Sequence, residues 1–210
     1  MKKIKIGDTI SLGWNLYKNN LGLCILATLV AMLVSGVTCG ICGGPLACGL
    51  FMVLQRLIKK SEPKPTIGDV FKGFDVFLHS FLIWIVSFVG YWFIQMILAC
   101  IPVIGWLISL ILSFIYAPIL VWSWMLIADR KMKWTEAIGF VLKELFNGNF
   151  TTPVILGILA GLIGGLGCFL CGIGIIFTIP LSYCIYAAAY EQLFSSAPLD
   201  SEPKQVEVVN

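Results

Sequence analysis

Charge is what this sequence has least of. Only 12% of its 210 residues are Asp, Glu, Lys or Arg, whereas about a quarter is usual in soluble domains. Three long stretches hold none of these residues: 19–55, 76–128 and 145–190. Because hydrocarbon excludes charged side chains, the gaps mark where the chain enters lipid. The sequence therefore predicts an integral membrane protein and excludes an ordinary soluble domain.

The groups that carry chemistry are scarce as well. His79 is the one histidine, so two axial histidine ligands for a transmembrane haem are missing. The uncharged stretches lack the carboxylates that ion-coupled transporters bury and a Ser–His nucleophile pair. The net charge of +3 is too low for a nucleic-acid surface. We therefore predict a non-enzymatic protein without a cofactor or bound nucleic acid.

What the sequence does have is length for repeated crossings, since each uncharged stretch fits two passes of about 20 residues. We expect an all-α protein with six transmembrane helices in three hairpins. The basic clusters then share one side of the membrane, and the uncharged turns at 40–44, 101–105 and 167–172 share the other. The positive-inside rule then places both termini and all basic loops on the cytoplasmic side of the membrane.

The chain also repeats itself weakly, which predicts an internal triplication within one membrane domain, 1–194. The units are about 6–60, 66–132 and 134–194, and 195–210 is expected to be a flexible cytoplasmic tail. Each unit opens with an amphipathic stretch, 7–20, 66–78 or 134–147, that has an acidic residue in its first turn: Asp8, Asp69 and Glu136. We expect these stretches to be helices lying in the cytoplasmic interface. The alternative is a soluble amphipathic helix packed on other protein.

A proline opens the second span of each unit, and the first charged residue follows eleven positions later. The equal offset places one cation and two anions at one depth. We favour a structural ion cluster that ties the hairpins together. Separate snorkelling to water and a substrate gate are the alternatives. The pairs are Pro45 with Arg56, Pro118 with Asp129, and Pro180 with Glu191.

Small residues recur at four-residue spacing in two runs. Such runs allow helices to approach closely, either within the chain, as we expect, or between copies. The residues are Gly36, Gly40 and Gly44 in the first hairpin, and Gly157, Gly161 and Gly165 in the third.

Two cysteine pairs stand at the outer turns, Cys39 with Cys42 and Cys168 with Cys171. Four thiolates at this spacing could hold zinc, and two disulfides are a second possibility. The flanking residues are Gly, Ile, Phe and Leu, which disfavour thiolate formation. We therefore predict inert packing and no metal, with the other two interpretations left open.

Three segments resemble a known family. They are 67–74 (Ile-Gly-Asp-Val-Phe-Lys-Gly-Phe), 43–46 (Gly-Gly-Pro-Leu) and 172–181 (Gly-Ile-Gly-Ile-Ile-Phe-Thr-Ile-Pro-Leu) with Ala-Tyr-Glu at 189–191. They resemble uncharacterised bacterial multi-pass proteins related to the membrane domain of some glycerophosphodiester phosphodiesterases. The resemblance covers about 7–194. The metal-binding acids and histidines of the phosphodiesterase part are not in this sequence, so the resemblance implies a membrane module and no hydrolase activity.

Together these features lead to two functional hypotheses. The first is an oligomeric scaffold that engages or organises membrane lipid through its amphipathic helices; its protein partner, if it has one, is unknown. The alternative is a transport or channel component for a lipid-like substrate, which needs a continuous cavity lined by Gln95, Tyr91, Tyr116 or Ser113. A redox or metal protein of the outer cysteines is a third, weaker interpretation.

Overall fold

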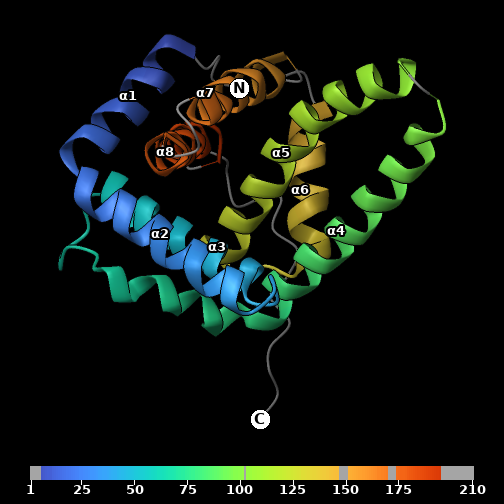
Figure 1. Ribbon diagram of the computed structural model, residues 1–210. Coiled ribbons are helices and arrows are strands. Elements are labelled where there is room, and N and C mark those ends of the chain that lie inside the picture. The colour runs from blue at the N-terminus through green and yellow to red at the C-terminus, as the bar shows by residue number, and fades with distance from the viewer. Residues whose placement is uncertain (1–5, 102, 147–150, 170–173, 195–210) are drawn as a thin grey trace.

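The computed structural model describes residues 6–101, 103–146, 151–169 and 174–194, and within these ranges every regular element is a helix (Figure 1). The predicted all-α fold is thus confirmed. In chain order the elements are α1 (Ile6–Asn19), α2 (Leu21–Val37), α3 (Gly43–Ile58), the 3₁₀ helix η1 (Ile67–Val76), α4 (Phe77–Ala99), α5 (Ile104–Arg130), α6 (Trp134–Phe146), α7 (Thr151–Phe169) and α8 (Ile175–Phe194).

Local sequence signals fix several helix ends. Thr66 and Asp69 form a capping box at the start of η1, in which each side chain satisfies a backbone N–H that the helix leaves free. Pro45 lies in the first turn of α3, where its missing N–H costs nothing. α5 ends where Lys131 adopts a left-handed conformation with φ of 51°.

The segments that follow the three prolines form the centre of the core. In α3, α5 and α8, most residues from Pro45, Pro118 and Pro180 to the first charge are buried. The three segments also touch one another. Phe51 of α3 meets Tyr183 of α8 edge to face at a centroid distance of 5.4 Å. The Trp122 indole of α5 donates to the Tyr186 carbonyl of α8 over 3.3 Å. The equal spacing seen in the sequence therefore corresponds to one shared core.

Each amphipathic helix packs on the second helix of a different hairpin. η1 lies on α3, α6 on α5, and α1 on α8, so the first surface helix contacts the last core helix and the order closes on itself (Figure 1). The residue after each first-turn acid lies on the side of its helix that faces protein. Thr9, Val70 and Ala137 are all fully buried.

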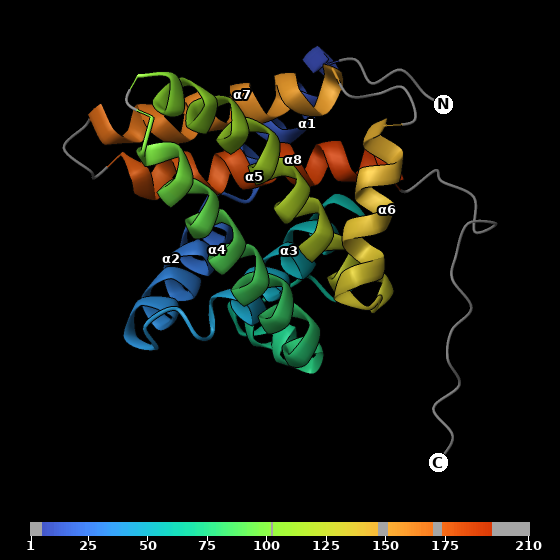
Figure 2. The same ribbon diagram turned by 90° about the vertical axis from the view of Figure 1, so that its right-hand side faces the viewer.

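Two of the described helical stretches are long and apolar enough to cross a membrane: η1 with α4, and α5. A third results if α1 and α2, which meet at a bend of 89°, form one broken span. α4 and α5 make an arm at one side of the molecule (Figures 1 and 2). Their apolar windows are only 6% and 17% buried, as lipid-facing helices require.

The structure therefore yields two or three candidate spans where the sequence predicts six. α3 has 16 residues, which extend for about 24 Å, less than the roughly 30 Å of a hydrocarbon core. The described apolar part of α7, Val154–Gly167, is also short. Judged by length, α3 and the described apolar part of α7 are each too short to cross the membrane. The predicted hairpins α2–α3 and α7–α8 therefore each contain one helix that does not qualify as a span.

Candidate functional site

A layer of polar contacts joins the ends of α3, α5 and α8, where the charged residues begin. Asp129 of α5 forms an ion pair with Lys59 at 3.0 Å and accepts a hydrogen bond from the Tyr190 hydroxyl of α8 at 3.2 Å. Arg130 donates to the Phe194 carbonyl at the end of α8 over 2.9 Å. A cation at a helix C-terminus also interacts favourably with the helix dipole. The layer ties the three core helices together at one end.

The predicted cluster of Arg56, Asp129 and Glu191 has a different set of partners. Arg56 pairs with Asp69 at 3.3 Å, and Asp129 pairs with Lys59. Within the described residues no ion pair joins the three to one another. Glu191 has a buried carboxylate oxygen that lacks a hydrogen-bond partner in the same ranges. The equal offset indicated a common level in the chain, but it could not indicate which neighbour each charge meets.

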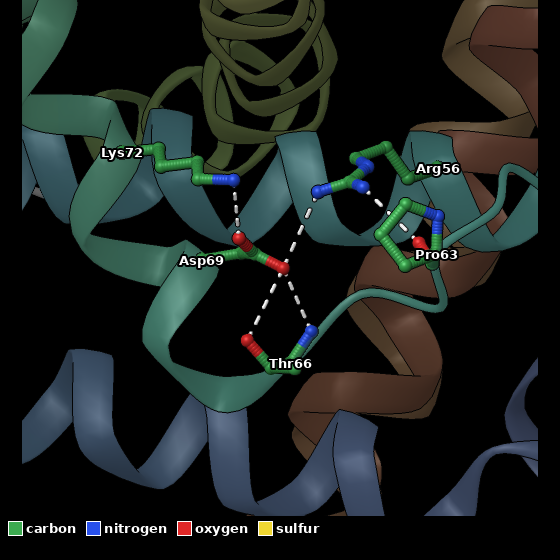
Figure 3. Close-up of polar contacts among 5 residues, drawn as sticks. All are labelled: Arg56, Pro63, Thr66, Asp69 and Lys72. Carbon is green, nitrogen blue, oxygen red and sulfur yellow. Dashed lines mark hydrogen bonds and ion pairs between the residues drawn. The ribbon is translucent and has the colours of Figure 1, made fainter.

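Asp69 is the centre of the second polar group (Figure 3). Its carboxylate accepts from the Thr66 backbone N–H at 2.7 Å, and ion pairs join it to Lys72 at 2.6 Å and to Arg56. The Lys72 hydrogen bond, followed by that of the Thr66 backbone, lowers the pKa of Asp69. In its charged form, the Asp69 carboxylate thus joins the start of η1 to the end of α3.

Of the six glycines predicted to pack helices, three stand at close contacts between helices. A Cβ on Gly44 would overlap the Ser80 carbonyl of α4, and one on Gly157 would overlap the Phe114 carbonyl of α5. At Gly161 the Phe114 ring is 2.9 Å from the position of a Cβ. Gly40 instead occupies the turn after α2 with φ of 84°. Gly36 and Gly165 have no such neighbour within 4 Å.

Three glycines outside these runs make close contacts of two surface helices, α1 and η1. Gly49 of α3 and Gly73 of η1 face each other, and Gly13 of α1 lies against Ile185 of α8, whose Cα is 2.8 Å from the position of a Cβ. Sequence reasoning missed these residues because it searched for runs at four-residue spacing. For Gly13 and Gly73, the available signal was their position inside the amphipathic stretches; Gly49, in α3, had no such signal.

The residues proposed to line a channel fill a seam between α4 and α5 instead. The Tyr91 and Ser113 hydroxyls are 2.7 Å apart, and Ser109 donates to the Gln95 side-chain oxygen over 2.6 Å. The Tyr91 and Tyr116 rings stack at 4.7 Å. These groups satisfy one another, and they line neither of the two cavities described next.

The first cavity is an apolar groove of about 640 Å³ beside α2, α3 and α4. Trp84, Phe88, Trp124 and Tyr183 lie along it, and Gly36 opens its α2 side. Stacked rings lead from η1 along α4 to this groove, with successive centroids 5.4 to 6.5 Å apart. The rings are Phe71, Phe74, Phe77, Phe81, Trp84 and Phe88.

The second cavity, of about 450 Å³, has a mixed polar and apolar lining and lies between the end of α1 and the loop that follows α3. It contains cations, amides and apolar side chains together. Sequence reasoning did not single it out, because its residues come from separate segments.

The outer cysteines keep their three interpretations. Cys39 is exposed and Cys42 half-buried, and both are free thiols. Cys171 lies outside the described residues, and of Cys168 only the backbone at the end of α7 is described. A different pair comes together in the core: the Sγ atoms of Cys24 and Cys184 are 3.8 Å apart, and both side chains are buried.

Comparison with known proteins adds no relative. The chain matches no protein-family model, no curated protein and no solved structure. The resemblance to the membrane domain of some glycerophosphodiester phosphodiesterases therefore stays a prediction.

Proposed function

We propose that the chain is a non-enzymatic, oligomeric scaffold of the bacterial inner membrane that engages lipid through α1, η1 and α6. In this proposal it crosses the membrane six times in three hairpins, with both termini in the cytoplasm. The observation that carries the proposal is the closed packing order, in which each amphipathic helix lies on the second helix of a different hairpin. Such an arrangement holds three lipid-facing helices around one solid core.

Triplication is supported by positions that correspond across the units. Thr9, Val70 and Ala137 follow the first-turn acids and are all buried against a core helix. The segments after the three prolines are buried in the same manner. Independent helices would have no reason to repeat both features at the same offsets.

Lipid engagement is supported by the way the apolar faces of α1 and η1 are divided between protein and the outside. Small residues such as Thr9 and Gly13 are buried against protein, whereas Trp14 is 50% exposed. On η1, Val70 and Gly73 are buried, and Phe71 is 46% exposed. Exposed aromatic side chains beside a charged face are typical of helices that lie in the membrane interface.

The shortness of α3 is compatible with a six-span layout. Arg56 and Lys59 stand at its C-terminal end, and long cationic side chains can reach the headgroups from inside the hydrocarbon boundary. A short span also thins the bilayer locally, at a modest cost. Local thinning is itself a way in which a scaffold organises lipid.

Oligomer formation is tested by measuring the mass of the protein in detergent. We expect more than one copy per particle. Gly165 has no neighbour within 4 Å in its own chain, so Gly165→Leu should lower the mass towards that of one copy while the helix content stays unchanged. Gly90→Leu is the matched control, because Gly90 is equally open on α4. A monomeric wild-type protein would contradict the scaffold.

The apolar groove favours one alternative, a transport component for a lipid-like substrate. Its volume of about 640 Å³ and its aromatic walls suit an acyl chain. Translocation of a fluorescent phospholipid in proteoliposomes separates the two functions. The scaffold predicts a rate equal to that of empty liposomes. A faster rate that Gly36→Leu abolishes would favour transport, since Gly36 lines the groove.

A further inference from the structure

The second cavity, of about 450 Å³, gathers positively charged side chains at one place on the surface. Arg56, Lys60 and Lys64 line it, and Glu62 is the one acidic residue of its lining. Arg56 is already engaged by Asp69 and by the Pro63 carbonyl. Lys60 and Lys64 form no ion pair with any described residue. Two lysines are therefore left to attract an anion.

Side-chain amides around the pocket offer donors. Asn19 and Asn20, which precede α2, line the pocket, and the Asn20 side chain donates back to the Leu16 carbonyl over 3.1 Å and does not cap α2. The Asn20 amide is therefore engaged, and Asn15 and Asn19 supply the other amide side chains of the lining. The nearby end of α3 adds no free acceptor at Gln55 or Arg56, because backbone N–H groups satisfy both carbonyls.

Another part of the lining is apolar. Leu12, Leu16, Leu57 and Ile58 contribute to it, and a free phosphate ion would leave these side chains unused. A molecule that carries both a phosphate and hydrocarbon would use the whole pocket. Trp14, exposed on the same helix α1, is a side chain suited to the headgroup level of a bilayer.

We infer that this pocket binds the phosphate-bearing headgroup of an anionic phospholipid, with Lys60 and Lys64 as its cationic contacts. The inference rests on the proposed function, because it needs α1 to lie in a lipid interface. It adds a lipid class and a site: the pocket prefers an acidic glycerophospholipid over a zwitterionic one. The remaining amide donors, Asn15 and Asn19, line the same pocket.

The test measures how much lipid the full-length protein retains. The protein is incubated with phosphatidylglycerol or phosphatidylcholine, and bound lipid is detected by native mass spectrometry after release from detergent. The test variant is Lys60→Asn with Lys64→Gln. Asn suits position 60, where φ is 49°, because it tolerates the left-handed region. The matched control is Lys131→Asn with Lys133→Gln. Lys131 has φ of 51°, and both lysines lie outside the pocket.

We expect wild-type protein to retain phosphatidylglycerol in preference to phosphatidylcholine. Removing a lysine should weaken retention of the acidic lipid by about fivefold, so the double test variant should lose most of the preference while the control keeps it. Equal losses in the two variants would show diffuse attraction and overturn the inference. So would a wild-type protein with no preference.

A third experiment distinguishes a lipid headgroup from a soluble phosphate as the ligand. A fourth distinguishes failure of this inference from failure of the proposed function. Glycerol phosphate added at the lipid concentration should not displace the lipid; displacement would show a site for soluble phosphate and overturn the lipid assignment. Insertion of the wild type and the test variant into neutral liposomes is measured in parallel. Failure of insertion contradicts the proposed function, whereas normal insertion with no headgroup preference contradicts this inference alone.

Discussion

Gly49 of α3 and Gly73 of η1 meet backbone to backbone. A Cβ on Gly73 would lie 3.0 Å from the Gly49 Cα and would overlap the Pro45 carbonyl. Contacts to backbone cannot be relieved by rotating a side chain, so this crossing accepts glycine alone at either position. Through it, η1 is held against the core while its aromatic side chains remain exposed.

Replacing Gly73 with alanine should therefore destabilise the protein. We expect a loss of about 1–3 kcal/mol, the usual cost of forcing an extra methyl group into a packed site. Thermal unfolding in detergent micelles, followed by circular dichroism, measures it. Gly68→Ala is the control on the same helix, since its Cβ would meet only the Thr66 hydroxyl at 3.8 Å. Equal unfolding temperatures for the two variants would contradict the crossing.

The contact that closes the packing order can be tested at Gly13. A Cβ there would lie 2.8 Å from the Ile185 Cα, so Gly13→Ala should loosen α1 from α8. Hydrogen exchange should become at least several-fold faster in α1 and remain unchanged in α6, which packs elsewhere. Gly7→Ala, where no atom lies within 4 Å, should leave exchange as in the wild type. Faster exchange in all helices would instead indicate global loss of stability.

The Asp69 carboxylate should make stability depend on pH. Its pKa is lowered by the hydrogen bond from Lys72 and by that from the Thr66 backbone, so the fold favours its charged form. The resulting stability is complete above the ordinary pKa of an aspartate and is lost as the pH falls through the lowered value. Asp69→Asn should be less stable at neutral pH and lose less on acidification.

Unfolding temperatures measured between neutral and acidic pH decide this prediction. Asp75→Asn serves as its control, because Asp75 lies on the exposed side of η1 and should keep the wild-type profile. An Asp69→Asn variant with the wild-type profile would show that the network contributes nothing.

The polar layer should depend more on Arg130 than on Lys59. The Lys59 side chain is 40% exposed, and exposed ion pairs contribute at most about 1 kcal/mol. Arg130 bonds to the Phe194 carbonyl and stands over the Phe140 ring at 5.6 Å. Such a charged hydrogen bond contributes about 1.5–3 kcal/mol. Chemical unfolding should show a larger loss for Arg130→Gln than for Lys59→Gln; the reverse order would contradict the layer as described.

Sequence reasoning reached the all-helical class, because long apolar stretches without charge are a property of the chain itself. It could not assign partners across space. Arg56 was expected beside Asp129, yet it meets Asp69. The close approach at Gly49 and Gly73 was also out of reach, since neither glycine belongs to a recognisable run. Helix bends such as the 89° between α1 and α2 depend on packing and not on local pattern.

The central claim is the layout of the hairpins in the membrane, and labelling of single cysteines in intact cells tests it most directly. Cys39 and Cys100 are exposed in the turns after α2 and α4, so each, kept as the sole cysteine, should react with an impermeant maleimide from outside. Cysteines introduced as Lys60→Cys and Lys131→Cys should react only after the membrane is opened. Labelling of either lysine position from outside the intact cell would contradict the account.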